Sequence, residues 1–228
     1  MKKFIAFLLI LLSLGLSAQN YYRIRVDMTV KKRYPDGKYT LNKGTIYYDN
    51  TTGKLVSDIW FPEKETYVMI DKMLYVIKDG KLINISQNPS PPETTIFALV
   101  LKNAIQYYGL ENSGYQLTDV EEDNGLVIST WLPPENFRKY VGKILIANKD
   151  GLITGIIFYG VDDKVVSKQF FEEYKNISGI MFPTRMIQFF YDDQGNETIQ
   201  KSEFKNIKID EKGNDNYYDF PINKYLKR

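Results

Sequence analysis

Carboxylates are the side chains of this 228-residue chain that could carry acid–base chemistry, because the sequence contains no histidine and no cysteine. The absence of histidine and cysteine excludes a Ser-His-Asp triad and a thiol nucleophile, and it argues against a transition-metal site. The acidic residues gather at 121–123, 162–163 and 192–193, each beside an expected turn. Paired carboxylates can hydrolyse glycosides, but acids beside turns are usually solvated. We therefore expect no enzyme activity, no metal and no cofactor, and a carboxylate hydrolase is the weakest of the alternatives.

The first residues have the pattern of an export signal. Lys2 and Lys3 precede an apolar run from Phe4 to Leu12, and small residues follow as far as Ala18. This pattern predicts a secretory signal peptide at 1–18 that is cleaved after Ala18, since the apolar run is too short to span a bilayer. No cysteine is available there for lipid attachment. We expect an exported protein that lies outside the cytoplasm and has no lipid anchor.

The remaining chain, 19–228, has about 210 residues and reads as a single domain without a break in composition. Removing Lys2 and Lys3 from the 30 basic residues leaves 28, which equals the number of acidic residues. A neutral chain has no electrostatic attraction to nucleic acid, so we expect no nucleic-acid partner.

Turn signals recur along the chain at short intervals, for example "PDG" at 35–37, "KDG" at 78–80 and "KDG" at 149–151. The runs between them are rich in Tyr, Ile, Val, Phe and Thr. Ile24, Val26 and Met28 alternate with polar residues, which is typical of a half-buried antiparallel strand. About ten such strands joined by hairpins predict a mainly β fold, a highly curved antiparallel meander that forms an unclosed barrel.

One segment breaks this pattern and predicts a helix near 95–108. "NPSPP" ends the preceding strand, and Thr94 or Thr95 is a suitable N-cap. Apolar residues at helical spacing follow, and Gly109 is well placed to end the helix. The helix is either ordinary core that closes one end of a barrel or a movable cover over an apolar cavity.

The order of these elements resembles the LolA/LolB-like superfamily of periplasmic lipoprotein carriers. The resemblance spans about residues 21–210. It rests on a "G-x-I-x-Y" strand at 44–48, an aromatic-Pro corner at 60–62 and a hairpin of the "lyvi-DG" form at 74–80. After the apolar helix come a second hairpin at 146–156 and a "Y-x-x-x-x-G-x-x-F-P" turn at 174–183.

This resemblance implies a location in the periplasm and an unclosed antiparallel barrel with an apolar helix covering its mouth. The concave face would hold the acyl chains of a lipoprotein or a similar amphiphile. The carrier would take them from an inner-membrane donor to an outer-membrane acceptor, as in outer-membrane lipoprotein sorting. The alternative is a non-catalytic scaffold of the cell envelope that shares the barrel but has a solid core.

Twelve apolar and aromatic residues are candidates for lining the cavity, although the sequence does not fix which face of each strand points inward. They are Trp60, Phe61, Tyr67, Met69, Phe97, Leu101, Ile105, Trp131, Ile146, Phe158, Phe182 and Met186. Each could equally be core. A basic loop with Arg138, Lys139 and Lys143 could meet an acidic partner, and a solvated loop is the other interpretation.

Overall fold

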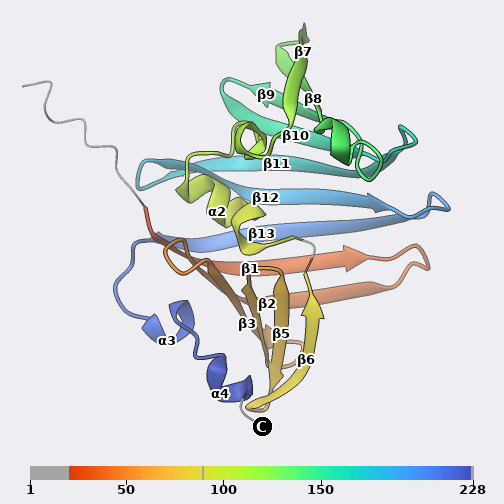
Figure 1. The fold of residues 1–228 in the computed structure, drawn as a ribbon. Helices are drawn as coiled ribbons and strands as arrows, with labels where there is room; N and C mark the ends of the chain where they lie inside the picture. Colours follow the sequence, from red (N-terminus) through yellow and green to blue (C-terminus); the bar gives the residue numbers. More distant parts are fainter. Residues whose placement is uncertain (1–20, 89, 227–228) are drawn as a thin grey trace, which may run out of the picture.

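The computed structural model describes residues 21–88 and 90–226 (Figure 1). The predicted signal peptide at 1–18 lies outside the described residues. Thirteen antiparallel strands form one sheet, in the order β6-β5-β4-β3-β2-β1-β13-β12-β11-β10-β9-β8-β7. The strands are β1 (Arg23–Arg33), β2 (Tyr39–Asp49), β3 (Lys54–Phe61), β4 (Glu65–Ile70), β5 (Met73–Lys78), β6 (Lys81–Gln87), β7 (Gln116–Asp123), β8 (Leu126–Leu132), β9 (Ile144–Lys149), β10 (Leu152–Tyr159), β11 (Val165–Ile177), β12 (Ile180–Tyr191) and β13 (Glu197–Ile209). The helices are η2 (Pro92–Thr94), α2 (Ile96–Leu101), η3 (Leu110–Asn112), η4 (Glu135–Phe137), α3 (Asp215–Tyr218) and α4 (Asn223–Leu226).

The mainly β, antiparallel and unclosed character of the fold is confirmed. β6 and β7 are the two free edges of the sheet, so it does not close into a barrel. Thirteen strands form where about ten were expected. β6 and β7 pair as edge strands although none of their side chains is buried. The sheet consists of two meanders, β1–β6 and β7–β13, which meet where the first strand pairs with the last.

Two-residue turns set the register of several hairpins. Asp79 and Gly80 both have positive φ between the paired residues Lys78 and Lys81. The same pattern recurs at 124–125 and 150–151. Two consecutive positive-φ residues give the turn whose twist matches that of paired strands, and Asp-Gly or Asn-Gly is the preferred sequence for it. These hairpins are the ones that the sequence marks most clearly.

Both faces of the sheet carry buried clusters because side chains alternate along each strand. On β2, Tyr48 points to one face and Tyr47 to the other, and both are buried. We call the face of Tyr48 the inner face and the face of Tyr47 the outer face. The larger cluster fills the inner face and includes α2. The smaller cluster lies on the outer face under α3 and α4.

The connection between β6 and β7 crosses the inner face. It must do so in this topology, because it joins the two opposite edges of one sheet. Figure 1 shows the sheet curving around α2, which contacts β1 and β12. We call residues 92–112 the inner cover. All six residues of α2 are buried.

α2 is shorter than the sequence predicts. Thr95 caps its start by accepting a hydrogen bond from the Ala98 amide at 3.5 Å, as expected. The helix ends at Leu101 instead of near 108, because Asn103 adopts a left-handed conformation with φ of 52°. The Ala104 amide then donates to the Leu99 carbonyl at 2.8 Å, which is the hydrogen bond of a Schellman motif. Asparagine tolerates this conformation better than most residues, so Asn103 was the signal for the early end.

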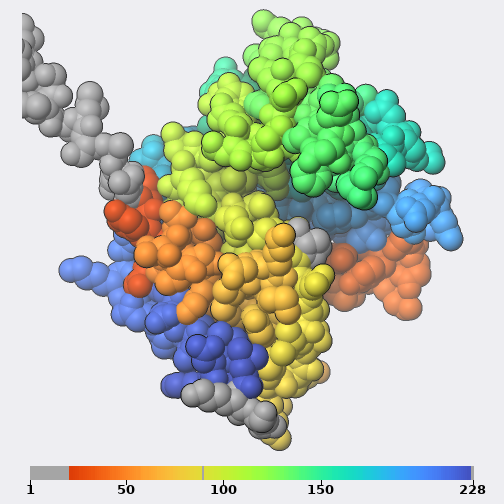
Figure 2. Space-filling view, in the orientation of Figure 1, coloured from red at the N-terminus to blue at the C-terminus, as the bar shows by residue number. Residues whose placement is uncertain are grey.

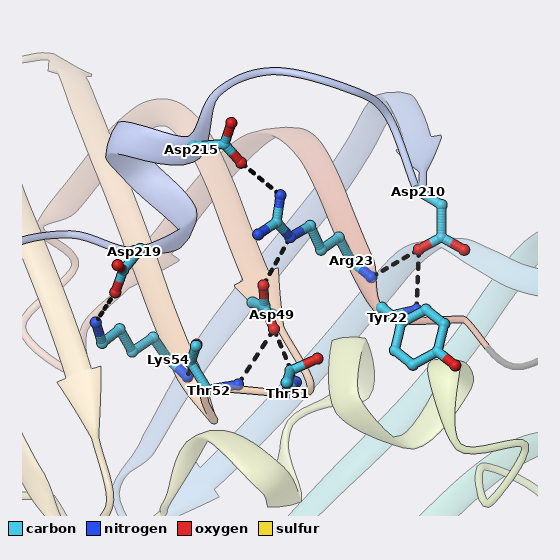
Figure 3. Close-up of polar contacts among 9 residues, drawn as sticks. All are labelled: Tyr22, Arg23, Asp49, Thr51, Thr52, Lys54, Asp210, Asp215 and Asp219. Carbon is cyan, nitrogen blue, oxygen red and sulfur yellow. Dashed lines mark hydrogen bonds and ion pairs between the residues drawn. The ribbon is translucent and has the colours of Figure 1, made fainter.

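The outer face is covered by the C-terminal segment 210–226, which we call the outer cover. Its aromatic rings pack on the sheet, where Tyr217 stacks on Tyr47 with ring centroids 4.4 Å apart. Figure 3 shows the polar contacts beside this packing. Arg23 bridges the buried Asp49 at 2.7 Å and Asp215 at 2.6 Å, so it joins the sheet to α3.

Candidate functional site

A cavity of about 950 Å³ lies between the inner cover and the sheet. Its walls come from α2 and η3 on one side and from β1, β2 and β10–β13 on the other. Figure 2 shows the residues of the inner cover, in yellow-green, at the front of the molecule between the two halves of the chain. This volume is at the upper end of the range of about 300–1,000 Å³ that is typical of small-molecule sites.

Aromatic side chains line the deep part of this cavity. Phe97 of α2 and Phe204 of β13 meet edge to face, with ring centroids 5.6 Å apart. The buried ring of Phe182 lies 5.8 Å from Phe204 and 6.3 Å from Phe97. Met28 and Met186 add flexible apolar surface to the lining. This part of the cavity can accept an apolar chain as a ligand.

A polar row crosses the same inner face. Gln169, Gln188 and Gln200 stand directly opposite one another on β11, β12 and β13, and all three line the cavity. The Gln200 amide nitrogen donates to the Gln188 side-chain oxygen at 3.0 Å, and the Tyr108 hydroxyl donates to Gln169 at 3.2 Å. Burial raises the pKa of Tyr108, so its phenol is neutral at physiological pH. We call the three glutamines the amide row.

Charge is scarce around the cavity. Glu93 and Lys102 are the charged residues among its described lining, and both are exposed. The lining otherwise consists of apolar, amide and hydroxyl side chains and glycine. A buried ionic group of a ligand would therefore lack an opposite charge inside.

A second cavity of about 350 Å³ lies on the β2–β5 half of the inner face. It shares Met28 with the larger cavity. The Tyr67 hydroxyl donates to Glu65 at 2.6 Å within it. Burial, together with the carboxylate of Glu65, raises the pKa of Tyr67 to about 12. Glu63 and Glu65 also line this cavity, and Lys78 pairs with both carboxylates.

The structure distributes the twelve predicted lining residues over four environments. Phe97, Phe158 and Met186 line the larger cavity, and Tyr67 and Met69 line the smaller one. Five others belong to the inner-face core: Leu101, Trp131, Ile146 and Phe182 are buried, and Ile105 packs against them. Trp60 and Phe61 are 58% and 42% exposed and line neither cavity. The strand β3 ends at Phe61, and its last two side chains project beyond the core.

The structure also shows where the three basic residues of the predicted basic loop lie. Arg138 and Lys139 are exposed next to η4. Lys143 pairs with Asp163 at 3.0 Å. One of the three charges is therefore already partnered within the chain.

Sequence reasoning missed the amide row. The signal was available in "MIQFF" and "TIQKSEF", where Met186 and Gln188 share one face of β12, and Gln200 and Phe204 share one face of β13. Polar residues in phase with apolar residues on an inward face indicate a polar band inside a cavity. The pattern was hidden because the opposite face of β12 is also apolar.

The three acidic clusters do not form a site. Glu121, Glu122 and Asp123 are exposed on β7. Hydrogen bonds from Lys164 and Asn196 hold the pKa values of Asp162 and Asp192 below the usual range, whereas a general acid needs a raised pKa. Within the described ranges, no group of three or more His, Cys, Asp or Glu side chains is placed to hold a metal ion. No helix in the same ranges is long and apolar enough to cross a membrane.

Comparison with solved structures relates this geometry to known proteins. A LolA superfamily protein from Nitrosomonas europaea matches with a TM-score of 0.59 and 15% identity, covering 87% of this chain and 91% of its own. A protein domain from Vibrio parahaemolyticus that is named for outer membrane lipoprotein sorting matches with a TM-score of 0.64 and 12% identity, covering 92% and 93%.

The chain has the fold of the LolA superfamily. A DUF1329 family protein from Desulfovibrio piger shares this fold, with a TM-score of 0.62 and 15% identity over 88% of this chain and 90% of that one. The resemblance inferred from the order of sequence motifs is thus confirmed at the level of fold. No protein-family model and no curated protein matches the sequence. The low identities fit a divergent chain on a LolA-like scaffold.

Proposed function

We propose that this protein is a periplasmic carrier that holds the acyl chains of a lipoprotein, or of a similar amphiphile, in the larger inner-face cavity. The observation that carries the proposal is an aromatic and apolar cavity of about 950 Å³ beneath a short apolar helix. The LolA-like fold supports it, since the Vibrio relative is named for lipoprotein sorting.

In this proposal the inner cover is the movable lid of the cavity. It closes the mouth when the protein is empty and moves outward when an acyl chain enters. Asn103 and Gly109, which both have positive φ, interrupt the helical path of the cover, so it has natural points for bending. Export by the predicted signal peptide would bring the carrier to the compartment where a donor in the inner membrane and an acceptor in the outer membrane can meet it.

We assign the ligand-contacting role to Phe97, Phe158 and Met186 in the larger cavity, with Tyr67 and Met69 in the smaller one as an extension. Met28 lines both cavities, and a movement of its flexible side chain would let a long chain continue from one cavity to the other. Leu101, Ile105, Trp131, Ile146 and Phe182 support the walls. We place Trp60 and Phe61 outside the ligand site because of their exposure.

A non-catalytic scaffold of the cell envelope is the second candidate. The complete burial of the six residues of α2 favours it, because a fully buried helix also fits a solid core. The two functions differ in one measurable property, which is uptake of an acyl chain by the purified protein.

Titration with a fluorescent fatty-acid analogue tests the carrier function. Each buried methylene contributes about 0.8 kcal/mol before costs, so a dissociation constant near 1 µM is within reach. A diacylated lipopeptide should displace the analogue. Absence of binding at high micromolar analogue, with folded protein, would reject the carrier and leave the scaffold.

A matched pair of variants locates the site. Met186→Trp places a large ring in the cavity and should weaken binding of the analogue at least tenfold. Met181→Trp lies at an exposed position of the same strand and should leave binding unchanged. Equal effects of the two substitutions would place the ligand elsewhere.

A further inference from the structure

Two hydrogen bonds, from Tyr108 to Gln169 and from Gln200 to Gln188, are the contacts observed among the described residues for the side-chain amides of the amide row. Gln169, Gln188 and Gln200 are brought into line by the registers of β11, β12 and β13, and their side chains border the cavity. Buried polar groups normally have partners, and the partners observed here use only part of the hydrogen-bonding capacity of the three amides.

Donors remain free for a ligand. Gln169 and Gln188 accept hydrogen bonds through their oxygens, which leaves their NH₂ groups available. Within the described part of the chain, no hydrogen bond is donated by either of these two groups to protein. Two amide groups that face a cavity and carry unused donors can bind a carbonyl oxygen.

The position of the row orients the ligand. The neighbouring inward row contains Phe171, Met186 and Ser202, and Phe204 lies one step further along β13. On the other side of the amide row lie Ser167, its β10 partner Phe158 and the partly exposed Phe190. The amide row therefore lies between the buried aromatic part of the cavity, at Phe97 and Phe204, and its more exposed end. A ligand with its acyl chain in the aromatic part would place its first polar linkage near these glutamines.

The positions of the nearby lysines indicate whether the polar linkage of the ligand is charged or neutral. Lys102 of the rim is exposed. Lys32 pairs with Gln200 across β13 and β1, and its ammonium lies 5.2 Å from the centroid of the Tyr34 ring. Lys32 is not among the residues that line the cavity, and Lys102 lies at its rim, so a carboxylate bound at the row would be desolvated without a cation of the described lining beside it. A neutral ester or amide carbonyl accepts hydrogen bonds without this cost.

We propose that the amide row binds the ester or amide carbonyl through which an acyl chain is linked, and so selects acylated ligands over free fatty acids. The proposal rests on the carrier function and adds the class of head group. Gln169 and Gln188 donate to the carbonyl oxygen, and the pair between Gln188 and Gln200 holds the donor in place.

Displacement of the neutral dye N-phenyl-1-naphthylamine by three ligands of equal chain length tests the selection. They are dodecanoic acid at pH 8, its monoglyceride and its primary amide. The expected result is that the monoglyceride and the amide bind about tenfold more tightly than the acid. Equal affinities, or tighter binding of the acid, would overturn the proposal while leaving the carrier function intact.

The double variant Gln188→Met/Gln200→Met removes two amides that bond each other and keeps their side-chain length. It should weaken binding of the monoglyceride about tenfold and change binding of the acid less than twofold. Gln116→Met on the exposed strand β7 is the matched control and should change neither. An unchanged monoglyceride affinity in the double variant would refute the role of the row. If none of the three ligands displaces the dye from folded protein, the carrier function itself fails.

Discussion

The two covers of the sheet are attached by different forces. The outer cover is tied to the strands by directed contacts that include Arg23–Asp215, Lys54–Asp219 and a hydrogen bond from Tyr217 to Asp58 at 3.0 Å. The inner cover is held mainly by apolar packing. Among the described residues, one hydrogen bond joins it to a strand, from Tyr108 to Gln169.

This difference suggests a division of labour between the faces. Directed polar contacts fix one geometry, because they lose their strength when donor and acceptor separate. Apolar packing is non-directional and can be replaced by another apolar surface such as an acyl chain. In the proposed carrier, the outer cover would be permanent structure and the inner cover would be exchangeable.

Leu101→Glu is the strongest test of this contrast. An unpaired buried carboxylate costs several kcal/mol, a large share of a total stability of about 5–15 kcal/mol. If the inner cover is exchangeable, it should swing outward, and fast hydrogen exchange should be confined to about residues 95–108 while strand amides stay protected.

Leu55→Glu is the control for that experiment, because Leu55 is buried in the same cluster on β3. It should remove protection throughout the sheet. Global loss of protection in Leu101→Glu as well would make the inner cover ordinary core and would contradict the lid mechanism.

Asp49→Ala should produce the next largest effect. Its buried carboxylate accepts hydrogen bonds from Arg23 at 2.7 Å and from the amides of Thr51 and Thr52 at 2.7 and 3.2 Å (Figure 3). Removing it should lower the free energy of unfolding by about 2–3 kcal/mol in urea titrations. Asp49→Asn keeps the shape and should cost less. A loss below about 0.5 kcal/mol in the alanine variant would show that the outer cover does not depend on this carboxylate.

Alkaline pH tests burial under the inner cover. Burial, with the nearby Glu93 and Asp49 carboxylates, raises the pKa of Tyr48 to about 12. An unfolded tyrosine ionises near pH 10, so between about pH 10 and 12 the unfolded chain releases a proton that the folded chain keeps. Stability should fall across this window as pH rises. Tyr48→Phe should reduce the fall by about 1–2 kcal/mol, measured by urea unfolding at pH 8 and pH 11.5.

The size of that reduction reports on the inner cover. A cover that opens readily would let water reach the phenol in the folded protein, and the effect of Tyr48→Phe would then shrink toward zero. A full effect would mean that the cover stays closed in the absence of a ligand.

Asp219→Asn should have the smallest effect. The carboxylate pairs with Lys54, but its side chain is 72% exposed. Exposed ion pairs contribute little and weaken with salt. A small loss of stability that vanishes at 1 M NaCl would show that the outer cover depends on its buried contacts instead of its surface charges. A larger, salt-independent loss would oppose that view.

The sequence predicts the hairpins well because their signals are local. Asp79-Gly80 specifies its turn through the conformations of two residues, and the paired strands follow. The early end of α2 was missed because Asn103 competes with a continuing apolar pattern, and its left-handed conformation decides the outcome. The pairing of β1 with β13 is not visible in the sequence, since it joins residues more than 160 positions apart.

The sequence predicts an apolar interior, but it does not predict which residues line the cavity. Aromatic content indicated an apolar interior, but the choice between wall and core depends on register. Phe97 and Phe182 are adjacent in space and both were predicted to line the cavity, yet of the two only Phe97 is among its lining residues. Trp60 is exposed at the end of its strand, a placement that the sequence alone does not indicate.

The seam between the first and last strands has a consequence for biogenesis. β1 leaves the ribosome early but gains its second neighbour only when residues 197–209 have been made. Contacts of such long sequence separation slow folding, because a large loop must close before they form. β1, which lies next to the middle of the sheet, thus remains half-paired until the chain is nearly complete. A chain truncated before β13 should present two unprotected edges in its middle and aggregate, while the full-length chain, once the seam closes, buries both.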